Sequence, residues 1–113
     1  MAKTKAQVEK ELREYIRMLT GLYNIFAVVL YGSYAQGKAK DSSDIDIAVF
    51  SDSFGDNPVE EMTRLFKLRR AIDTDIEPLP FSKESFLKHG EADFVKHILS
   101  TGKILYREGQ LYI

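Results

Sequence analysis

Apolar residues near the start of the chain recur at the spacing of a helix. Between residues 4 and 20 they return every three or four positions, and charged side chains occupy most of the positions between them. This periodicity is typical of an amphipathic helix that packs one face on a core, and Thr4 can serve as its N-cap. The expected buried stripe consists of Val8, Leu12, Tyr15, Ile16 and Leu19.

Two segments that follow have the patterns of β-strands. Residues 25–31, IFAVVLY, are apolar at successive positions and rich in β-branched and aromatic residues, which predicts a central strand covered on both faces. Residues 44–50, DIDIAVF, alternate instead. Because successive side chains of a strand point to opposite faces, three apolar side chains share one face, while Asp44, Asp46 and Ala48 share the other.

A second helix is expected after this strand. Asn57 can cap it, Pro58 suits its first position, and Glu60 has the spacing of a capping box. We therefore expect a helix that runs from residue 58 to about Ala71.

The next apolar segment predicts a short strand at an edge of the sheet. Residues 74–79, TDIEPL, place Asp75 and Glu77 on one face if they form a strand. Pro78 and Pro80 lack N–H groups that would point to the same side, so the hydrogen-bonded ladder cannot continue there.

The last third of the chain predicts two helices and a hairpin. Ser82 can cap a helix, with Phe81 and Phe86 at the spacing of a hydrophobic staple. A further helix over residues 92–101 should stop at Gly102, after which KILY and LYI flank a turn. Helices and strands thus alternate, which predicts an α/β (α+β) fold with a mixed β-sheet flanked by helices.

Composition limits the kinds of protein this can be. A chain of 113 residues with 44% hydrophobic content suits a single domain over residues 1–113. We find neither a membrane-spanning run nor a signal peptide, so we expect a cytoplasmic protein. The absence of cysteine excludes disulfides and thiolate metal sites. A net charge of −1 does not indicate a nucleic-acid-binding domain, which is usually basic overall, although a local basic patch is still possible.

Asp44 and Asp46 are the first candidates for chemistry. On a strand they hold their carboxylates side by side, and two such anions repel unless a cation lies between them. Mg²⁺ or Mn²⁺ suits oxygen ligands of this kind and completes its shell with water and substrate phosphates. Two such ions could stabilise the attacking and leaving oxygens of a phosphoryl transfer.

Gly32 and Ser33 are the second candidates, because they end the first strand ahead of an expected helix start. Glycine lets the backbone approach a phosphate closely, and exposed N–H groups with the Ser33 hydroxyl can donate to it. Lys38 and Lys40 could add positive charge. Each feature alone is common in ordinary turns and solvated strand ends, but their combination over ten intervening residues is specific.

This combination of Gly-Ser, ten residues and Asp-Ile-Asp between two apolar strands resembles the nucleotidyltransferase superfamily related to DNA polymerase β. The resemblance is closest to the minimal nucleotidyltransferases, which are often the antitoxins of modules with a HEPN-type toxin. It extends over the whole chain, since IEPLPFSKESF and the later GKILY are similar to the closing segments of that family.

The resemblance implies that a nucleoside monophosphate, AMP if ATP is the donor, is transferred to an acceptor hydroxyl with release of pyrophosphate. It assigns Asp44 and Asp46 as catalytic metal ligands, and Gly32 and Ser33 as nucleotide-binding residues. A third carboxylate would ligate the catalytic metal and help to deprotonate the acceptor. We assign it to Glu77 from its "IEP" context and keep Asp75 in reserve.

The resemblance also bears on partners. Large members of the superfamily carry additional domains that grip the acceptor, so here we expect a partner protein or a second copy of the chain to hold it. The acceptor could be a tyrosine of a HEPN-type toxin. The alternative is a non-catalytic, antitoxin-like module that masks its partner and keeps a regulatory nucleotide site.

Overall fold

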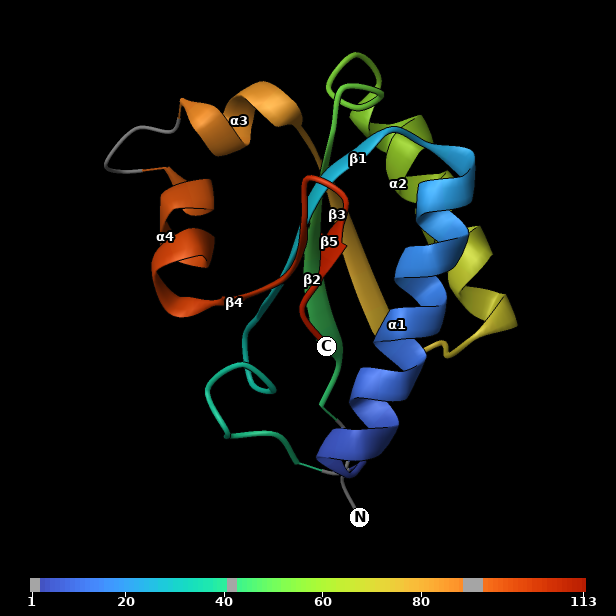
Figure 1. Ribbon diagram of the computed structural model, residues 1–113, viewed down its shortest axis with the longest axis vertical. Helices are drawn as coiled ribbons and strands as arrows, with labels where there is room; N and C mark the ends of the chain where they lie inside the picture. The colour runs from blue at the N-terminus through green and yellow to red at the C-terminus, as the bar shows by residue number, and fades with distance from the viewer. Residues whose placement is uncertain (1–2, 41–42, 89–92) are drawn as a thin grey trace.

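Five strands form one mixed sheet, and helices lie against both of its faces (Figure 1). The computed structural model describes residues 3–40, 43–88 and 93–113. The order of strands across the sheet is β3 (Ile76–Ser82), β2 (Ile45–Ser51), β1 (Ile25–Tyr31), β4 (Lys103–Arg107) and β5 (Gln110–Leu111). Strands β2 and β3 are parallel and the other neighbouring pairs are antiparallel, so the predicted mixed sheet is confirmed.

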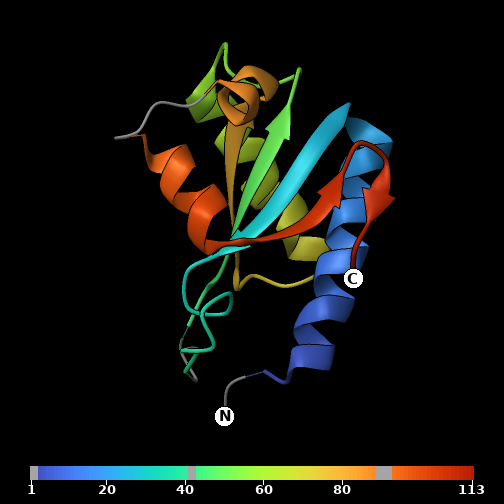
Figure 2. The same cartoon turned by 60° about the vertical axis from the view of Figure 1, so that its left-hand side comes forward.

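Strand β1 is the middle strand, as its continuous apolar pattern predicts. Its residues from Ala27 to Val29 are fully buried, because helices cover both faces of the sheet at this point. In the view of Figure 2, β1 lies between β2 and the terminal hairpin of β4 and β5. The hairpin turns through Glu108 and Gly109, both at positive φ, which matches the twist of two-residue hairpin loops.

The first helix, α1 (Lys5–Leu22), confirms the predicted stripe. The Thr4 side chain accepts a hydrogen bond from the Gln7 backbone N–H, and the Gln7 side chain accepts one from the Thr4 N–H, which completes a capping box. All members of the predicted stripe are buried: Val8, Leu12, Tyr15, Ile16 and Leu19.

The two faces of the sheet carry two apolar clusters. Ile45, Ile47 and Val49 of β2 pack in the cluster that includes α1. Ala48 and Phe50 point to the opposite face, where they join the buried residues of the later helices. The alternation along residues 44–50 therefore divides the strand between two cores, as the sequence predicts, and Figure 1 shows α1 and α2 on one side with α3 and α4 on the other.

Helix α2 (Pro58–Leu68) begins where its cap predicts. The Asn57 side chain accepts a hydrogen bond from the Glu60 N–H, but Glu61 rather than Glu60 accepts one from the Asn57 N–H. The helix ends at Leu68 and continues as a 3₁₀ turn, η1 (Arg69–Ala71), so helical structure does extend to Ala71.

Strand β3 is an edge strand, as its prolines predict, since it pairs with β2 alone. Its position along the chain differs from the prediction: it begins at Ile76 instead of residue 74 and runs to Ser82. Asp75 lies ahead of it in a turn where its N–H donates to the Asp73 carboxylate. Because of this local hydrogen bond, residues 74 and 75 form a turn instead of the start of the strand. Aspartate side chains often compete with regular secondary structure in this way.

Two short helices close the face that carries Ala48 and Phe50. Helix α3 (Lys83–Leu87) is capped by Ser82, as predicted, and α4 (Phe94–Thr101) stops at its C-cap, Gly102, as predicted. The predicted start of this last helix at residue 92 lies outside the described residues. In the described part of the chain, no helix is both long and apolar enough to span a membrane.

Candidate active site

Three polar side chains form a row across the sheet. Tyr31, at the end of β1, is opposite Asp46 of β2, and Asp46 is opposite Glu77 of β3. Directly opposed residues of neighbouring strands point to the same face, which here is the face of α3 and α4. The two carboxylates and the phenol therefore lie side by side at one end of the sheet.

Asp44 adds a third carboxylate to this end of the sheet. It is exposed and comes just before β2, two residues from Asp46, which is half-buried. Burial raises the pKa of the Asp46 carboxyl, and the negative charges of Asp44 and Glu77 raise it further. The same surroundings act on the phenol: burial, Asp46 and Glu77 raise the pKa of Tyr31 to about 12, so its hydroxyl stays protonated at neutral pH.

Gly32 brings the backbone against the Asp46 carboxylate. A Cβ on Gly32 would lie 2.5 Å from Oδ2 of Asp46, and its φ of +75° belongs to the left-handed region that favours glycine. No other residue type fits this position without moving the carboxylate. The end of β1 and the start of β2 are thus in direct contact, which places the Gly-Ser step beside the aspartates.

The loop after Gly32 makes one turn of helix and then stops, where the sequence predicts the start of a helix. The Gln36 N–H donates to the Gly32 carbonyl at 3.1 Å, and the Lys38 N–H donates to the Ser33 carbonyl at 2.9 Å. The backbone N–H groups of residues 33–35 have no hydrogen-bond acceptor among the described residues. Such free, consecutive N–H groups are suited to an anion.

Arg69 holds Glu77 at the other end of the row. Its Nη1 lies 3.2 Å from Oε1 of Glu77 and donates to the Ile76 carbonyl at 2.8 Å, while its guanidinium stacks 4.4 Å from the centre of the Phe66 ring. The sequence patterns do not predict this pairing. The pattern carries no signal for it, because the contact joins the end of a helix to a strand.

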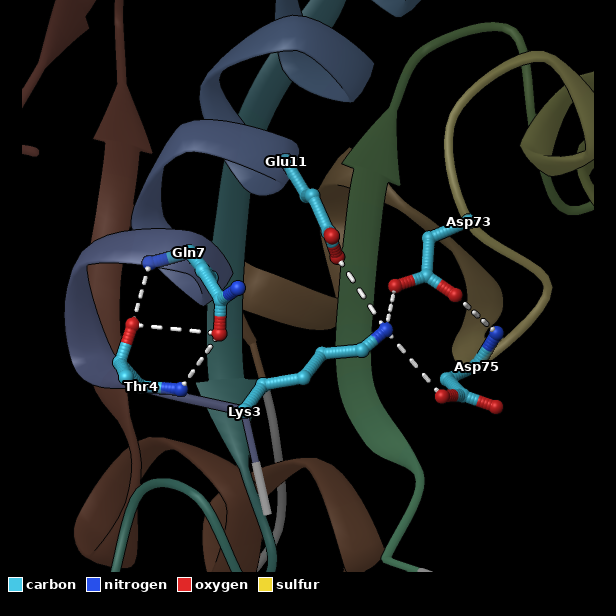
Figure 3. A network of polar contacts seen from close by, with 6 residues as sticks. All are labelled: Lys3, Thr4, Gln7, Glu11, Asp73 and Asp75. Atoms are coloured by element: carbon cyan, nitrogen blue, oxygen red, sulfur yellow. Dashed lines mark hydrogen bonds and ion pairs between the residues drawn. The ribbon is translucent and has the colours of Figure 1, made fainter. Parts of the chain in front are cut away.

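Asp75 belongs to a different network (Figure 3). Its Oδ2 lies 3.2 Å from Nζ of Lys3, which also pairs with Asp73 and lies 3.5 Å from Oε2 of Glu11. The predicted common strand face of Asp75 and Glu77 is wrong, because Asp75 lies outside β3. Glu77 lies in the carboxylate row, whereas Asp75 binds the residue that leads into α1.

The donor set of the row fits a divalent cation bound together with phosphates. In residues 3–40, 43–88 and 93–113 there is no ready cluster of three acidic or histidine side chains arranged around one point. Two aspartates are nevertheless enough for Mg²⁺ or Mn²⁺, which binds proteins through one or two carboxylates and substrate oxygens. Burial and the negative charges of Asp44 and Glu77 raise the pKa of Asp46, and a bound cation would offset both effects.

Comparison with known proteins agrees with this geometry. A family model described as "Polymerase beta, Nucleotidyltransferase" matches residues 10–110. A protein of Methanocaldococcus jannaschii that carries the name protein adenylyltransferase is 33% identical over 101 residues. That match covers 87% of this chain and 97% of the relative.

Solved structures share the fold. A crystal structure described as a nucleotidyltransferase from Sulfolobus solfataricus superposes with a TM-score of 0.64 over 100% of this chain and 97% of that chain, at 18% identity. A toxin–antitoxin structure with AMP-PNP gives a TM-score of 0.58 at 25% identity, over 88% of this chain and 73% of that chain. A mutant of the toxin–antitoxin pair MntA–HpeT gives 0.60 at 27% identity, over 88% and 72%.

Proposed function

This chain belongs to the polymerase beta nucleotidyltransferase family and is a nucleotidyltransferase, and from this premise we propose that it transfers AMP from ATP to a hydroxyl of a protein. The observation that carries the proposal is the contact of Gly32 with Asp46, together with the register of Asp46 and Glu77. One small region of the sheet thereby offers both a phosphate-binding loop and the acidic groups that phosphoryl transfer uses.

The loop after β1 would hold the triphosphate. Gly32 lets phosphate oxygens approach the backbone, and the Ser33 hydroxyl with the free N–H groups of residues 33–35 would donate to them. Lys38 and Lys40 are exposed on the same loop and add positive charge near the phosphates. These contacts would place the α-phosphate beside the aspartates.

Asp44, Asp46 and Glu77 would hold the metal, Mg²⁺ or Mn²⁺. When bound, the metal would supply positive charge to the phosphates and to the attacking oxygen. Burial and the neighbouring carboxylates raise the pKa of Asp46, so a bound cation would favour its ionised form, and the protonated Tyr31 hydroxyl beside it can donate to an oxygen ligand.

Glu77 would accept the proton of the attacking hydroxyl. The acceptor oxygen forms a bond to the α-phosphorus, the bond from that phosphorus to the leaving oxygen breaks, and pyrophosphate departs. Arg69 pairs with the Glu77 carboxylate on β3, the edge strand of the sheet, from which an acceptor would approach. A positioned carboxylate in this role contributes to the rate of the chemical step.

The relatives support the choice of donor and acceptor. The name of the archaeal relative supports AMP as the transferred group and a protein as the acceptor. The toxin–antitoxin structure with AMP-PNP, an analogue of ATP, supports ATP as the donor and a toxin as the partner. We propose a tyrosine of a helical HEPN-type toxin as the acceptor and the cytoplasm, where ATP is abundant, as the place of the reaction.

Thermal unfolding with and without MgATP tests the nucleotide site. We expect MgATP to raise the melting temperature of the wild-type protein and to leave that of the double variant Asp44→Asn, Asp46→Asn unchanged. Without nucleotide the double variant should be at least as stable as the wild type, because the repulsion between the carboxylates is removed.

A matched control removes two other aspartates. Asp52→Asn with Asp56→Asn has the same change in charge at exposed positions beyond the opposite end of β2, and it should keep the shift with MgATP. A full shift in the Asp44, Asp46 variant would refute the site. MgATP binding without transfer to any acceptor would favour the module that only masks a partner.

A further inference from the structure

Three aromatic rings extend from the carboxylate row toward α4. The Tyr31 ring meets the Phe94 ring edge to face, with centroids 5.9 Å apart and an angle of 88°. The Phe94 ring lies nearly parallel to the His97 ring, with centroids 6.4 Å apart and an angle of 17°. We call Tyr31, Phe94 and His97 the aromatic row.

Phe94 is unusually open for a phenylalanine in such contacts. Half of its surface is exposed. It is the first residue of α4 and directly follows the N-cap, Asp93. Single exposed apolar side chains are ordinary on protein surfaces. This ring is different because Tyr31 connects it to the residues of the active site, and its other neighbour, His97, is also exposed.

The position of Phe94 is fixed by the helix that carries it. Val95 and Ile98 of α4 are buried in the cluster that contains Val29 and Phe50 of the sheet. A ring anchored next to two buried residues loses little conformational freedom when a ligand stacks on it, which lowers the cost of binding.

The aromatic row begins where the phosphates would end. Tyr31 directly precedes Gly32 and lies opposite Asp46, so a triphosphate held by the loop lies at its side. A nucleotide extends from its phosphates through the ribose to the base. The described side chains that continue from Tyr31 away from the carboxylates are Phe94 and then His97.

We propose that Phe94 is the stacking surface for the nucleobase of the donor nucleotide, with Tyr31 at the edge of its ring and His97 beyond it. This inference rests on the proposed function, since it presumes that a nucleotide is bound. Stacking accepts any base because every base has a π-face, so Phe94 would add affinity for nucleoside triphosphates without selecting adenine.

Calorimetric titration of two ligands isolates the contribution of the base. MgATP carries a base, whereas the magnesium complex of inorganic triphosphate carries only the phosphates. We expect Phe94→Ala to weaken MgATP binding about 5- to 150-fold, the range for loss of one stacked base, and to leave the binding of inorganic triphosphate unaffected. Phe94→Trp should retain or improve MgATP binding, which a mere structural role for the ring would not produce.

Tyr112→Ala is the matched control. Tyr112 is an aromatic residue of similar exposure, 55% against 50%, and it follows β5 at the opposite edge of the sheet from β3. Its removal should change neither titration. Melting curves of all the variants without ligand establish that they are folded.

Three results would overturn the inference. One is unchanged MgATP affinity in Phe94→Ala, which would leave the nucleotidyltransferase site itself intact. Another is an equal loss for both ligands, since the ring would then act on the phosphates or on the fold. The third is a rise in the KM for the acceptor alone, which would assign the ring to the acceptor. A wild-type protein that binds no MgATP would overturn the proposed function as well.

Discussion

At Gly32 the missing side chain is as important as the side chains around it. The space that a Cβ would occupy is filled by the Asp46 carboxylate, and the backbone has the left-handed φ that glycine adopts without strain. The glycine therefore serves two needs: it lets the loop turn, and it leaves room for an aspartate of the neighbouring strand. Gly37 in the same loop has a similar φ of +70° but nothing within 4 Å of its Cβ position.

This difference gives a prediction with an internal control. Gly32→Ala and Gly37→Ala should each lower the free energy of unfolding by about 1–2 kcal/mol through backbone strain. Only Gly32→Ala also pushes on the Asp46 carboxylate, so it alone should lose the melting-temperature shift with MgATP. Chemical denaturation and thermal melts measure the two effects, and equal loss of MgATP binding in both variants would contradict the role given to Gly32.

The third carboxylate gives another prediction at the level of single residues. Glu77→Gln should keep MgATP affinity and lower the rate of transfer about 100-fold or more, because a group that serves the attacking hydroxyl acts in the transition state. Asp75→Asn should change both only slightly, since Asp75 binds Lys3. Single-turnover transfer measured beside nucleotide affinity separates them, and an inactive Asp75→Asn with an active Glu77→Gln would reverse the assignment.

At the level of elements, local patterns predicted most of the fold. The apolar period of residues 4–20, the unbroken run of residues 25–31 and the cap at Asn57 each depend on neighbours in sequence, and each is confirmed. The alternation along residues 44–50 correctly placed Asp46 and Ala48 on the face opposite the α1 core.

The features that sequence patterns missed depend on contacts between distant parts of the chain or on competing local hydrogen bonds. The hydrogen bond from the Asp75 N–H to the Asp73 carboxylate delays the start of β3, so strand parity did not apply to Asp75. The pairing of Arg69 with Glu77 joins two elements. Tyr31 was predicted only as a strand residue, and its place beside the carboxylates follows from the register of β1 with β2.

The network of Lys3, Glu11 and Asp73 connects α1 to the turn before β3 and makes stability depend on pH. Burial and the nearby Asp73 carboxylate raise the pKa of Glu11 from 4.5 to about 7, against the opposite effect of Lys3. A carboxyl with a raised pKa in the folded state stabilises the fold when protonated. Its contribution is complete below pH 4.5 and is lost as the pH rises through 7.

Glu11→Gln should remove this dependence, because glutamine stays neutral. We expect wild type and variant to unfold alike near pH 5, and the variant to be more stable at pH 8 by roughly 1–2 kcal/mol. Asp73 is ionised in both states over this range and adds no slope of its own. Glu14→Gln, at an exposed position of the same helix, is the control, and an identical pH profile for Glu11→Gln and wild type would contradict the account.

At the level of the whole molecule, one sheet supports two apolar clusters and leaves one end of one face polar. The end of β1 and the starts of β2 and β3 meet there, and each contributes one residue to the row of Tyr31, Asp46 and Glu77. The β3 edge beside this row pairs with no further strand in the described residues. An acceptor carried by another protein could therefore approach the row from that edge.

Transfer of label from ATP tests the central claim most directly. The protein is incubated with Mg²⁺ and a lysate of its own host, with ATP labelled at either the α- or the γ-phosphate. We predict that adding the protein labels a lysate protein from α-labelled ATP, beyond the labelling of lysate alone, and adds no label from γ-labelled ATP, whereas the Asp44→Asn, Asp46→Asn variant adds none from either. Added label from the γ-phosphate, no added label from either, or undiminished added labelling by the double variant would contradict the assignment of this site to AMP transfer.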